Sequence, residues 1–408
     1  MATERINIIA GIDTHSDTHH VAVINDHGKP LADEQFLAVG SGYRKIIDFI
    51  TSYGTVTAVG VEGTGSYGAE LARTLRAEGL LVLEVNRPNR AARRLKGKSD
   101  PLDAYQAAQA VLDGRAKSVP KAKDGPVECL RILRAERTSA VKARTAAINQ
   151  IKGLLVSAPD KLRAKYRGLG TSAMITALQR TRPTGQITDP EHVCLMTLKR
   201  LAVRYQTLSA EITEADAALH TILDTYAPTL CDLPGVGPEA ASQLLVTVGD
   251  NPDRLTDEAK FASLVGVAPI PASSGKTTRH RLSRGGDRNA NQALHQVVLV
   301  RMASCRRTKE YVARRTAEGK SKREIMRCLK RYAAREIYRQ ITNPQTAPDN
   351  ADLRQKRNEM GLTLANAAGY LGQWPSVISR LERGLMRNDD LATAYRQWLQ
   401  ERQTESMT

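Results

Sequence analysis

The chain has 408 residues, which is enough for roughly two to four domains that each bury their own core. Sixty lysines and arginines outweigh 43 acidic residues, and the net charge of +17 favours a polyanionic partner, with nucleic acid as the expected one. On charge alone, a basic ribosome-associated or membrane-surface protein is the alternative.

The five cysteines are widely spaced and form no CxxC or Cys/His cluster. The sequence therefore supports neither a disulfide framework nor a structural zinc site. No signal peptide opens the chain, and no window approaches about 18 uninterrupted apolar residues. We therefore expect a cytoplasmic, nucleoid-associated protein without a membrane partner.

Strands and helices alternate over about the first 120 residues. The expected strands cover residues 8–13, 20–25, 56–61 and 81–85, with another strand after the turn Asp26–Pro30. Helices are expected over 43–53 and 69–78 and from near Pro101. This order predicts an α/β domain with a mixed sheet, in which an antiparallel hairpin precedes β-α-β crossovers.

Four carboxylates lie at the ends of these elements. Asp13 ends the first apolar run, and Glu62 ends the strand before a glycine-rich turn that lets the backbone bend beside a ligand. Asp100 and Asp103 project from the same face of a helix N-terminus. Singly, each aspartate could be a turn residue or a helix cap. Because four converging acids repel one another without a cation, the ordered set predicts a site for Mg²⁺ or Mn²⁺.

The opening hairpin would also suit an actin-like sugar kinase, but residues 125–228 read as helical and not as a second α/β half. The basic stretch from residue 87 to 98 is either a solvated loop or a contact with a phosphate backbone. Its candidate nucleic-acid-binding residues are Arg87, Arg90, Arg93, Arg94, Lys96 and Lys98.

Apolar residues recur at helical spacing over residues 127–156 and again over residues 191–226, and a polar, partly irregular stretch lies between the two ranges. We expect an antiparallel pair or coiled-coil arm, or else an ordinary helical linker domain. The motif Leu233–Pro238 then predicts a helix-hairpin-helix. Backbone amides at its Gly235 and Gly237 would bind a DNA phosphate.

A serine turn follows in FASLVGVAPIPASSGKTTRHRLSRGGDR, residues 261–288. Ser273 or Ser274 could attack phosphorus while neighbouring cations stabilise the developing charge. The alternative is a phosphate-binding turn without chemistry. Helices over 290–305 and 322–340 should present a basic face to a nucleic-acid backbone. The expected nucleic-acid contacts around the turn are Lys276, Arg279, Arg281, Arg284 and Arg288.

Residues 343–352 read as a linker, and the last block resembles a Cro/repressor-type helix-turn-helix. Its recognition helix would present Ser376, Ser379 and Arg380. Leu364 stands where such domains usually have glutamine at the start of the second helix, which puts one phosphate or base contact in doubt.

Together, the motifs GIDTH, VEGTGSY, KSDPLDA, LPGVGP and APIPASSGK with RGGDR resemble the DEDD-type insertion-sequence transposases, the Piv-like family of bridge-RNA-guided recombinases. The likeness covers roughly residues 5–340. It implies an α/β plus α chain: a RuvC-like (RNase H-like) mixed-sheet catalytic domain at 1–122, a coiled-coil connector at 123–228 and a mainly helical transposase domain at 229–342. The linker at 343–352 and the helix-turn-helix at 353–400 fall outside the family pattern.

The resemblance also implies site residues and partners. Asp13, Glu62, Asp100 and Asp103 would bind Mg²⁺ or Mn²⁺, and Ser274, with Ser273 as the second candidate, would form a covalent phosphoserine link to DNA. The partners would be double-stranded DNA at the element ends and target, a structured guide RNA, and further copies of the chain, from dimer to tetramer.

The sequence thus predicts a transposase that excises and inserts its own mobile element. One alternative is a RuvC-like junction resolvase that uses the four acids without a serine. The other is a non-catalytic regulator that binds DNA through its helix-turn-helix.

Overall fold

The computed structural model describes residues 6–85, 99–251, 255–273, 280–281, 283, 285–344, 350–384 and 388–407. The chain divides into two compact units. The first comprises residues 1–128 and 248–256, and the second comprises residues 129–247 and 257–408. None of the described helices is both long and apolar enough to cross a membrane.

The first unit is built on a five-stranded mixed sheet with the strand order β3-β2-β1-β4-β5. β1 pairs antiparallel with β2 and parallel with β4. This arrangement confirms the predicted mixed sheet. The elements of the unit are β1 (Asn7–Thr14), β2 (Thr18–Asn25), β3 (Pro30–Leu37), α1 (Gly40–Ser52), β4 (Thr55–Glu62), α2 (Ala69–Ala77), β5 (Val82–Val85) and α4 (Asp100–Leu112).

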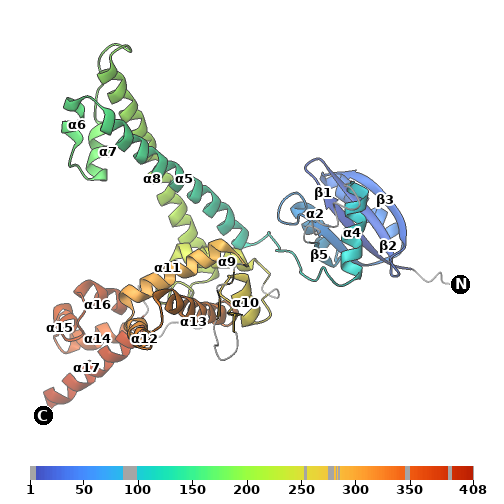
Figure 1. Ribbon diagram of the computed structural model, residues 1–408. Helices are drawn as coiled ribbons and strands as arrows, with labels where there is room; N and C mark the ends of the chain where they lie inside the picture. The colour runs from blue at the N-terminus through green and yellow to red at the C-terminus, as the bar shows by residue number, and fades with distance from the viewer. Residues whose placement is uncertain are drawn as a thin grey trace. The chain divides into compact units, whose positions relative to one another are not determined.

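Alternation along β1 assigns its side chains to two faces of the sheet. Ile8 and Ile12 belong to a buried core with Ile46 of α1 and Leu71 of α2. The opposite face carries Gly11 and is covered by α4 (Figure 1). Among the described residues, the sheet therefore lies between a layer containing α1 and α2 and the helix α4.

Glycine on the strands allows α4 to pack unusually close to the sheet. A Cβ at Gly11 would lie 2.1 Å from the carbonyl oxygen of Ala104, and one at Gly60 would lie 2.8 Å from that of Ala107. Helix backbone would therefore collide with any side chain at these strand positions. The small residues on both elements fix the height and direction of α4.

Outside the sheet unit, the chain is mostly helical, as predicted. α5 begins within the first unit and continues into the second. The elements are α5 (Pro126–Ser157), α6 (Asp160–Tyr166), α7 (Thr171–Gln179), α8 (Pro190–Tyr226), α9 (Pro238–Val248), α10 (Glu258–Leu264), β6 (Ile270–Pro271), β7 (His280–Arg281), α11 (Arg288–Ser304), α12 (Arg306–Ala317), α13 (Lys322–Thr342), α14 (Ala351–Glu359), α15 (Leu364–Tyr370), α16 (Pro375–Glu382) and α17 (Asp389–Met407).

α5 and α8 run side by side as a long antiparallel pair (Figure 1). Arg137 of α5 pairs with Asp216 of α8 at 2.5 Å. Farther along α5, Arg144 reaches Ser209, which lies earlier on α8. This geometry agrees with the expected antiparallel pair.

The stretch between these helices, predicted to be polar and partly irregular, contains the helices α6 and α7, and residues 180–189 after α7 form neither helix nor strand. Leu162, Tyr166 and Leu178 pack with Ile151 of α5 and Leu198 of α8. α6 and α7 have only seven and nine residues, and helices of that length are marginal in isolation, so packing on the long pair stabilises both.

Candidate metal centre and nucleic-acid interface

The register of β1 and β4 brings Asp13 and Glu62 to neighbouring strand ends. Ile12 pairs with Val61 in parallel register, and Asp13 and Glu62 are the next residues on their strands. Both lie two residues beyond a glycine covered by α4, so their side chains project from the same face of the sheet. Both are buried, and the Thr14 hydroxyl donates a 2.8 Å hydrogen bond to the Glu62 carbonyl oxygen.

The helix α4 brings the other two carboxylates to the same edge. Asp100 stands one turn before Ala104, which lies against Gly11, and Asp13 is two residues beyond Gly11 on β1. Four helical residues rise about 6 Å, and two strand residues advance about 6.6 Å. The two lengths match, so Asp100 lies beside the end of β1.

The same relationship holds for the second pair. Asp103 stands one turn before Ala107, which lies against Gly60, and Glu62 is two residues beyond Gly60. Asp103 is buried, with 3% of its surface exposed. It therefore faces the end of β4, as Asp100 faces the end of β1.

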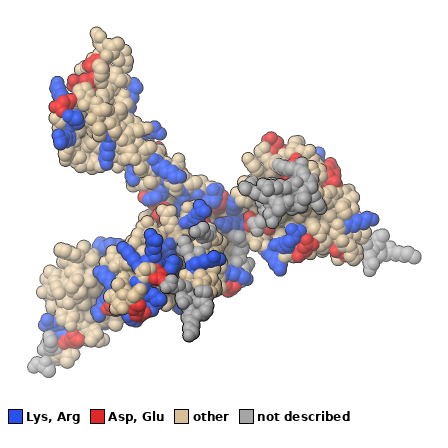
Figure 2. Space-filling view, viewed as in Figure 1, with Lys and Arg blue, Asp and Glu red and all other residues tan. Residues whose placement is uncertain are grey.

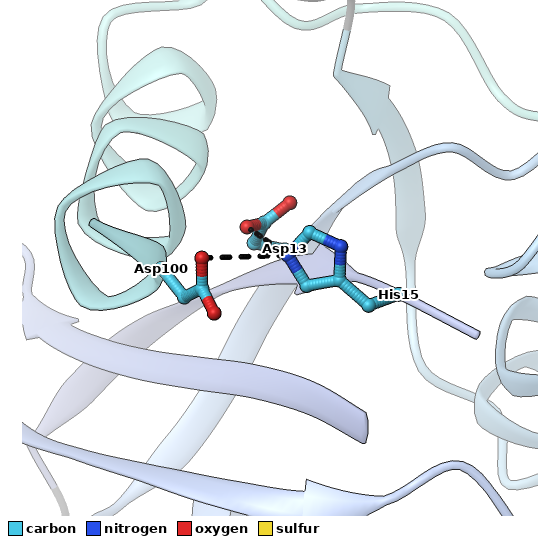
Figure 3. A group of neighbouring side chains, drawn as sticks. All are labelled: Asp13, His15 and Asp100. Atoms are coloured by element: carbon cyan, nitrogen blue, oxygen red, sulfur yellow. Dashed lines mark ion pairs between the residues drawn. The ribbon is translucent and has the colours of Figure 1, made fainter. Parts of the chain in front are cut away.

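His15 is a further side chain at this site, and sequence reasoning missed it (Figure 3). Its Nε2 atom lies 3.2 Å from Asp13 Oδ2 and 3.4 Å from Asp100 Oδ1. One donor atom from each of these three residues falls within 4.8 Å of the other two. The sequence did contain a signal for this residue, because the motif GIDTH places a histidine two residues after Asp13.

The donor set fits a divalent cation. Carboxylate oxygens are the ligands that Mg²⁺ and Mn²⁺ take, and imidazole adds a nitrogen donor that Mn²⁺ accepts. Asp13, His15 and Asp100 already present donor atoms at a common point. Such a cation would offset the repulsion between these carboxylates, of which Asp13, Glu62 and Asp103 are buried.

A hydrogen-bond chain braces α4 next to this site. His20, which pairs with Asp13 across β1 and β2, lies with its Nε2 atom 2.8 Å from Asp33 Oδ2. The Tyr105 hydroxyl on α4 donates a 3.0 Å hydrogen bond to Asp33 Oδ1. Burial, with a contribution from Asp33, raises the pKa of Tyr105 to about 12. These hydrogen bonds connect α4 to β3.

In the second unit, β6 and β7 pair antiparallel as two strands of two residues each. Ser273 is exposed just after β6. Ser274, Lys276, Arg279 and Arg284 lie outside the described residues, as do all six basic candidates between residues 87 and 98.

The Gly285-Gly286-Asp287 segment connects the end of α10 to the start of α11. A Cβ at Gly286 would lie 2.6 Å from the Leu264 carbonyl oxygen, and the Asp287 amide donates to that same oxygen at 2.7 Å. The Asp287 carboxylate caps α11 and accepts a 2.7 Å hydrogen bond from Thr247. This motif therefore holds the start of α11 against the end of α10.

A cavity of about 1210 Å³ adjoins this strand pair and is lined by residues of β7, α11 and α13, among others. Figure 2 shows lysine and arginine side chains gathered over the part of the second unit that holds α11 to α13. Two of the described acids line the cavity: Glu318 forms an ion pair with Arg315, and Glu324 accepts a hydrogen bond from the Ser321 amide. The basic lining residues are Arg281, Arg315, Lys320, Lys322, Arg323, Arg327, Lys330, Arg331 and Arg335.

Lys330 lies half-buried in this cavity wall. Its Nζ atom donates a 2.7 Å hydrogen bond to Asn291 Oδ1, and Asn291 in turn donates to the Gly266 carbonyl oxygen at 2.9 Å. Burial lowers the pKa of Lys330, and burial together with the Lys330 charge lowers the pKa of His295. The nine lysines and arginines that line the cavity give it a positive charge, which favours an anion there.

The glycine turn at Leu233–Pro238 packs against α11. A Cβ at Gly235 would lie 2.8 Å from the Val297 carbonyl oxygen, whereas one at Gly237 would meet nothing within 4 Å. Arg301 donates a 2.6 Å hydrogen bond to the Pro234 carbonyl oxygen. Only the second expected helix, α9, adjoins the turn, because α8 ends before Pro228 and a proline disfavours helix in the residue that precedes it.

The four C-terminal helices, α14 to α17, pack around a core of their own. A buried ion pair joins Arg357 to Glu382 at 2.7 Å, and the Tyr395 hydroxyl donates to the same carboxylate at 2.8 Å. On α16, Ser376 and Arg380 are exposed and Ser379 is partly exposed. These three side chains are accessible for an external contact.

Two family models match the chain. Residues 10–158 match the transposase model named DEDD_Tnp_IS110, and residues 227–313 match the Transposase IS116/IS110/IS902 family. Together they cover more than half of the chain, and the helices α14 to α17 lie outside both matches.

Curated relatives come from several insertion elements. The uncharacterized 42 kDa protein of insertion element IS900 from Mycobacterium paratuberculosis is 25% identical over 374 residues, covering 79% of this chain and 92% of that protein. The 43.6 kDa protein of IS110 from Streptomyces coelicolor is 24% identical, covering 81% and 92%. The transposase for IS1328 from Yersinia enterocolitica is 26% identical, covering 76% and 87%.

The chain belongs to the IS110 family of DEDD transposases. Its activity is that of a DNA transposase of an insertion sequence, and the family suggests the use of a divalent metal.

Proposed function

We propose that this transposase cuts and rejoins DNA strands with a metal-binding group of four acids and a serine nucleophile. The acids are Asp13, Glu62, Asp100 and Asp103, in a RuvC-like N-terminal domain. The observation that carries the proposal is the convergence of strand-end and helix-end carboxylates, in which Asp13 and Asp100 share His15 as a neighbour. The cation would be Mg²⁺ or Mn²⁺.

The carboxylates hold and orient the cation, which when bound polarises the phosphoryl oxygens of a DNA phosphodiester. The Thr14 hydrogen bond to the Glu62 carbonyl oxygen and the close packing of α4 keep the carboxylates in place. Such rigid support matters because small displacements of catalytic groups cost large factors in rate.

In the proposed strand exchange, the oxygen of Ser274, or of Ser273, forms a bond to phosphorus while one phosphorus–oxygen bond of the DNA breaks. The serine loses its proton, and the departing DNA oxygen gains one. A DNA hydroxyl then attacks the phosphoserine, which restores the serine. One phosphodiester replaces another, so the exchange requires no external energy source.

Basic surfaces would hold the nucleic acids. The cavity beside β7 supports this part of the proposal, since nine lysine and arginine side chains line it, Arg323 and Arg327 among them. The other proposed contacts are the basic residues between 87 and 98, the backbone at Gly235 and Gly237, Lys276, Arg279, Arg281, Arg284 and Arg288, and Ser376, Ser379 and Arg380 of a terminal helix-turn-helix.

By family resemblance, we also propose a structured guide RNA as a partner and an assembly of two to four copies of the chain. The proposed domains are the RuvC-like domain at 1–122, the coiled-coil connector at 123–228, the transposase domain at 229–342, the linker at 343–352 and the helix-turn-helix at 353–400. The capping box at Thr363 and the buried Arg357–Glu382 pair support an independently structured C-terminal domain.

Trapping the covalent link tests the proposal. The full chain would be incubated with Mg²⁺, the DNA that flanks its own gene and the RNA transcribed from that DNA, then separated under denaturing conditions. We expect a protein–DNA adduct that Ser274→Ala removes and Ser273→Ala leaves. Asp13→Asn should abolish cleavage while DNA binding persists.

The alternatives predict other results. A junction resolvase would cleave branched DNA without an adduct, and both serine variants would remain active. A non-catalytic regulator would be indifferent to Asp13→Asn and would lose function with Arg380→Ala.

A further inference from the structure

The position of His15 between two acidic side chains calls for an explanation. Its Nε2 atom is buried although the side chain as a whole is 39% exposed, so the ring points its nitrogen inward and leaves an edge in solvent. Figure 3 shows the ring directed toward Asp13 and Asp100. Hydrogen-bond geometry is met with neither carboxylate, despite distances of 3.2 and 3.4 Å.

The backbone fixes this position. His15 directly follows β1, and its amide donates a 3.0 Å hydrogen bond to the Thr18 carbonyl oxygen, which closes the turn into β2. Asp13, on the other side of Thr14, is held by strand pairing. The turn therefore directs His15 back over the strand end.

The spacing of the three donors suits direct coordination of one ion. Two donor atoms bound at about 2.1 Å and at right angles lie about 3.0 Å apart. The distances from His15 Nε2 to the two carboxylate oxygens are close to this value, and all three donor atoms lie within 4.8 Å of one another.

We propose that His15 is a fifth side-chain ligand of the metal centre and that its nitrogen makes the centre prefer Mn²⁺ over Mg²⁺. The inference rests on the proposed metal site and adds to its four acids. Mg²⁺ favours oxygen ligands, whereas imidazole binds first-row transition metals well. Removal of His15 should therefore weaken Mn²⁺ binding far more than Mg²⁺ binding.

Pulsed electron paramagnetic resonance of Mn²⁺ bound to the full chain tests this ligand directly. With ¹⁵N-histidine incorporated, we expect a nitrogen coupling to the manganese in the unmodified protein. The coupling should vanish in His15→Ala and persist in His27→Ala, a matched control because the His27 side chain is 87% exposed in the next turn. Absence of the coupling in the unmodified protein would overturn the inference without reliance on any variant.

Titrations of Mn²⁺ and Mg²⁺ give the second readout. His15→Ala should lower the Mn²⁺ affinity at least about tenfold and the Mg²⁺ affinity by less than about threefold. His15→Gln, which retains an oxygen donor, should show a smaller Mn²⁺ loss. Equal losses for both ions would contradict the proposed selectivity.

Asp13→Asn distinguishes failure of the proposed metal centre from failure of His15 as a ligand. If the unmodified protein binds Mn²⁺ no better than Asp13→Asn, the proposed metal centre itself is wrong, and the role of His15 with it. If Asp13→Asn abolishes binding but His15→Ala does not alter it, the acids form the centre and His15 is not a ligand.

Discussion

Gly11 of β1 lies directly beneath Ala104 of α4, so close that a Cβ at position 11 would sit 2.1 Å from the Ala104 carbonyl oxygen. This contact sets the height of α4 above the sheet. The first turn of α4 carries Asp100, so the contact also sets where that carboxylate meets Asp13.

Gly11→Ala should therefore damage both stability and the site. Backbone atoms cannot rotate away, so we expect a loss of about 3 kcal/mol or more in the free energy of unfolding, together with weaker metal binding. Urea unfolding and Mn²⁺ titration would measure the two effects. Gly40→Ala is the control, because a Cβ at Gly40 meets nothing within 4 Å. Equal urea midpoints for Gly11→Ala and the unmodified protein would refute the packing argument.

The buried ring of His19 predicts acid sensitivity. His19 is fully buried and stacks on Tyr43 at 5.7 Å, and burial is the main cause that lowers its pKa. The unfolded chain therefore binds a proton more readily than the folded chain. Stability should fall as the pH drops below about 6.5.

Urea unfolding across pH 5 to 8 would measure this loss. His19→Phe keeps an aromatic ring against Tyr43 without a titrating group. It should therefore lose less stability than the unmodified protein as the pH falls. His27→Ala, at an exposed histidine, should leave the pH profile unchanged. If His19→Phe has the same pH profile as the unmodified protein, the loss has another source.

The hydrogen-bonded Tyr105 predicts a loss of stability at alkaline pH. Its pKa is raised to about 12, mainly by burial and then by the hydrogen bond to Asp33. Because the folded pKa exceeds the unfolded value of 10, the stability that Tyr105 contributes is present below pH 10 and lost as the pH rises toward 12.

Thermal unfolding between pH 9 and 12 should show a shallower decline for Tyr105→Phe. At neutral pH this variant should be about 1 kcal/mol less stable, since the hydrogen bond that braces α4 is lost. Tyr67→Phe, at a tyrosine 59% exposed, is a matched comparison expected to keep the steep decline. Parallel declines for the two variants would argue against the role of Tyr105.

The cavity cations predict a change in the salt dependence of DNA binding. Arg323→Ala combined with Arg327→Ala should weaken binding and reduce the slope of log affinity against log salt by about 2, on the assumption that each arginine contacts one phosphate. Fluorescence anisotropy with duplex DNA at several salt concentrations would measure the slope.

Arg306→Ala is the control for this pair of substitutions. Arg306 is exposed on α12 and is paired with Glu310 at 2.8 Å. Its loss should leave the slope nearly unchanged. A similar slope for the double variant and the unmodified protein would mean that the cavity does not bind the DNA backbone.

Sequence patterns by themselves determined the order of elements and the candidate residues. Continuous apolar runs identified β1 and β4, helical spacing identified α5 and α8, and Asp13 and Glu62 stood out because each ends a buried strand. These signals are local, since they depend on backbone preferences and on the spacing of apolar residues within a single element.

Only the tertiary structure decided which side chains meet. The sequence contained Gly11, Gly60 and the alanines of α4, but nothing local shows that they pack together, because distances between elements depend on long-range contacts. His15 was overlooked for this reason. Its turn gives no sign of a binding site by itself, and only the packing of α4, which begins at Asp100, places a second carboxylate next to it. α6 and α7 are stabilised by the long pair that they pack on, so their own residues predicted them poorly.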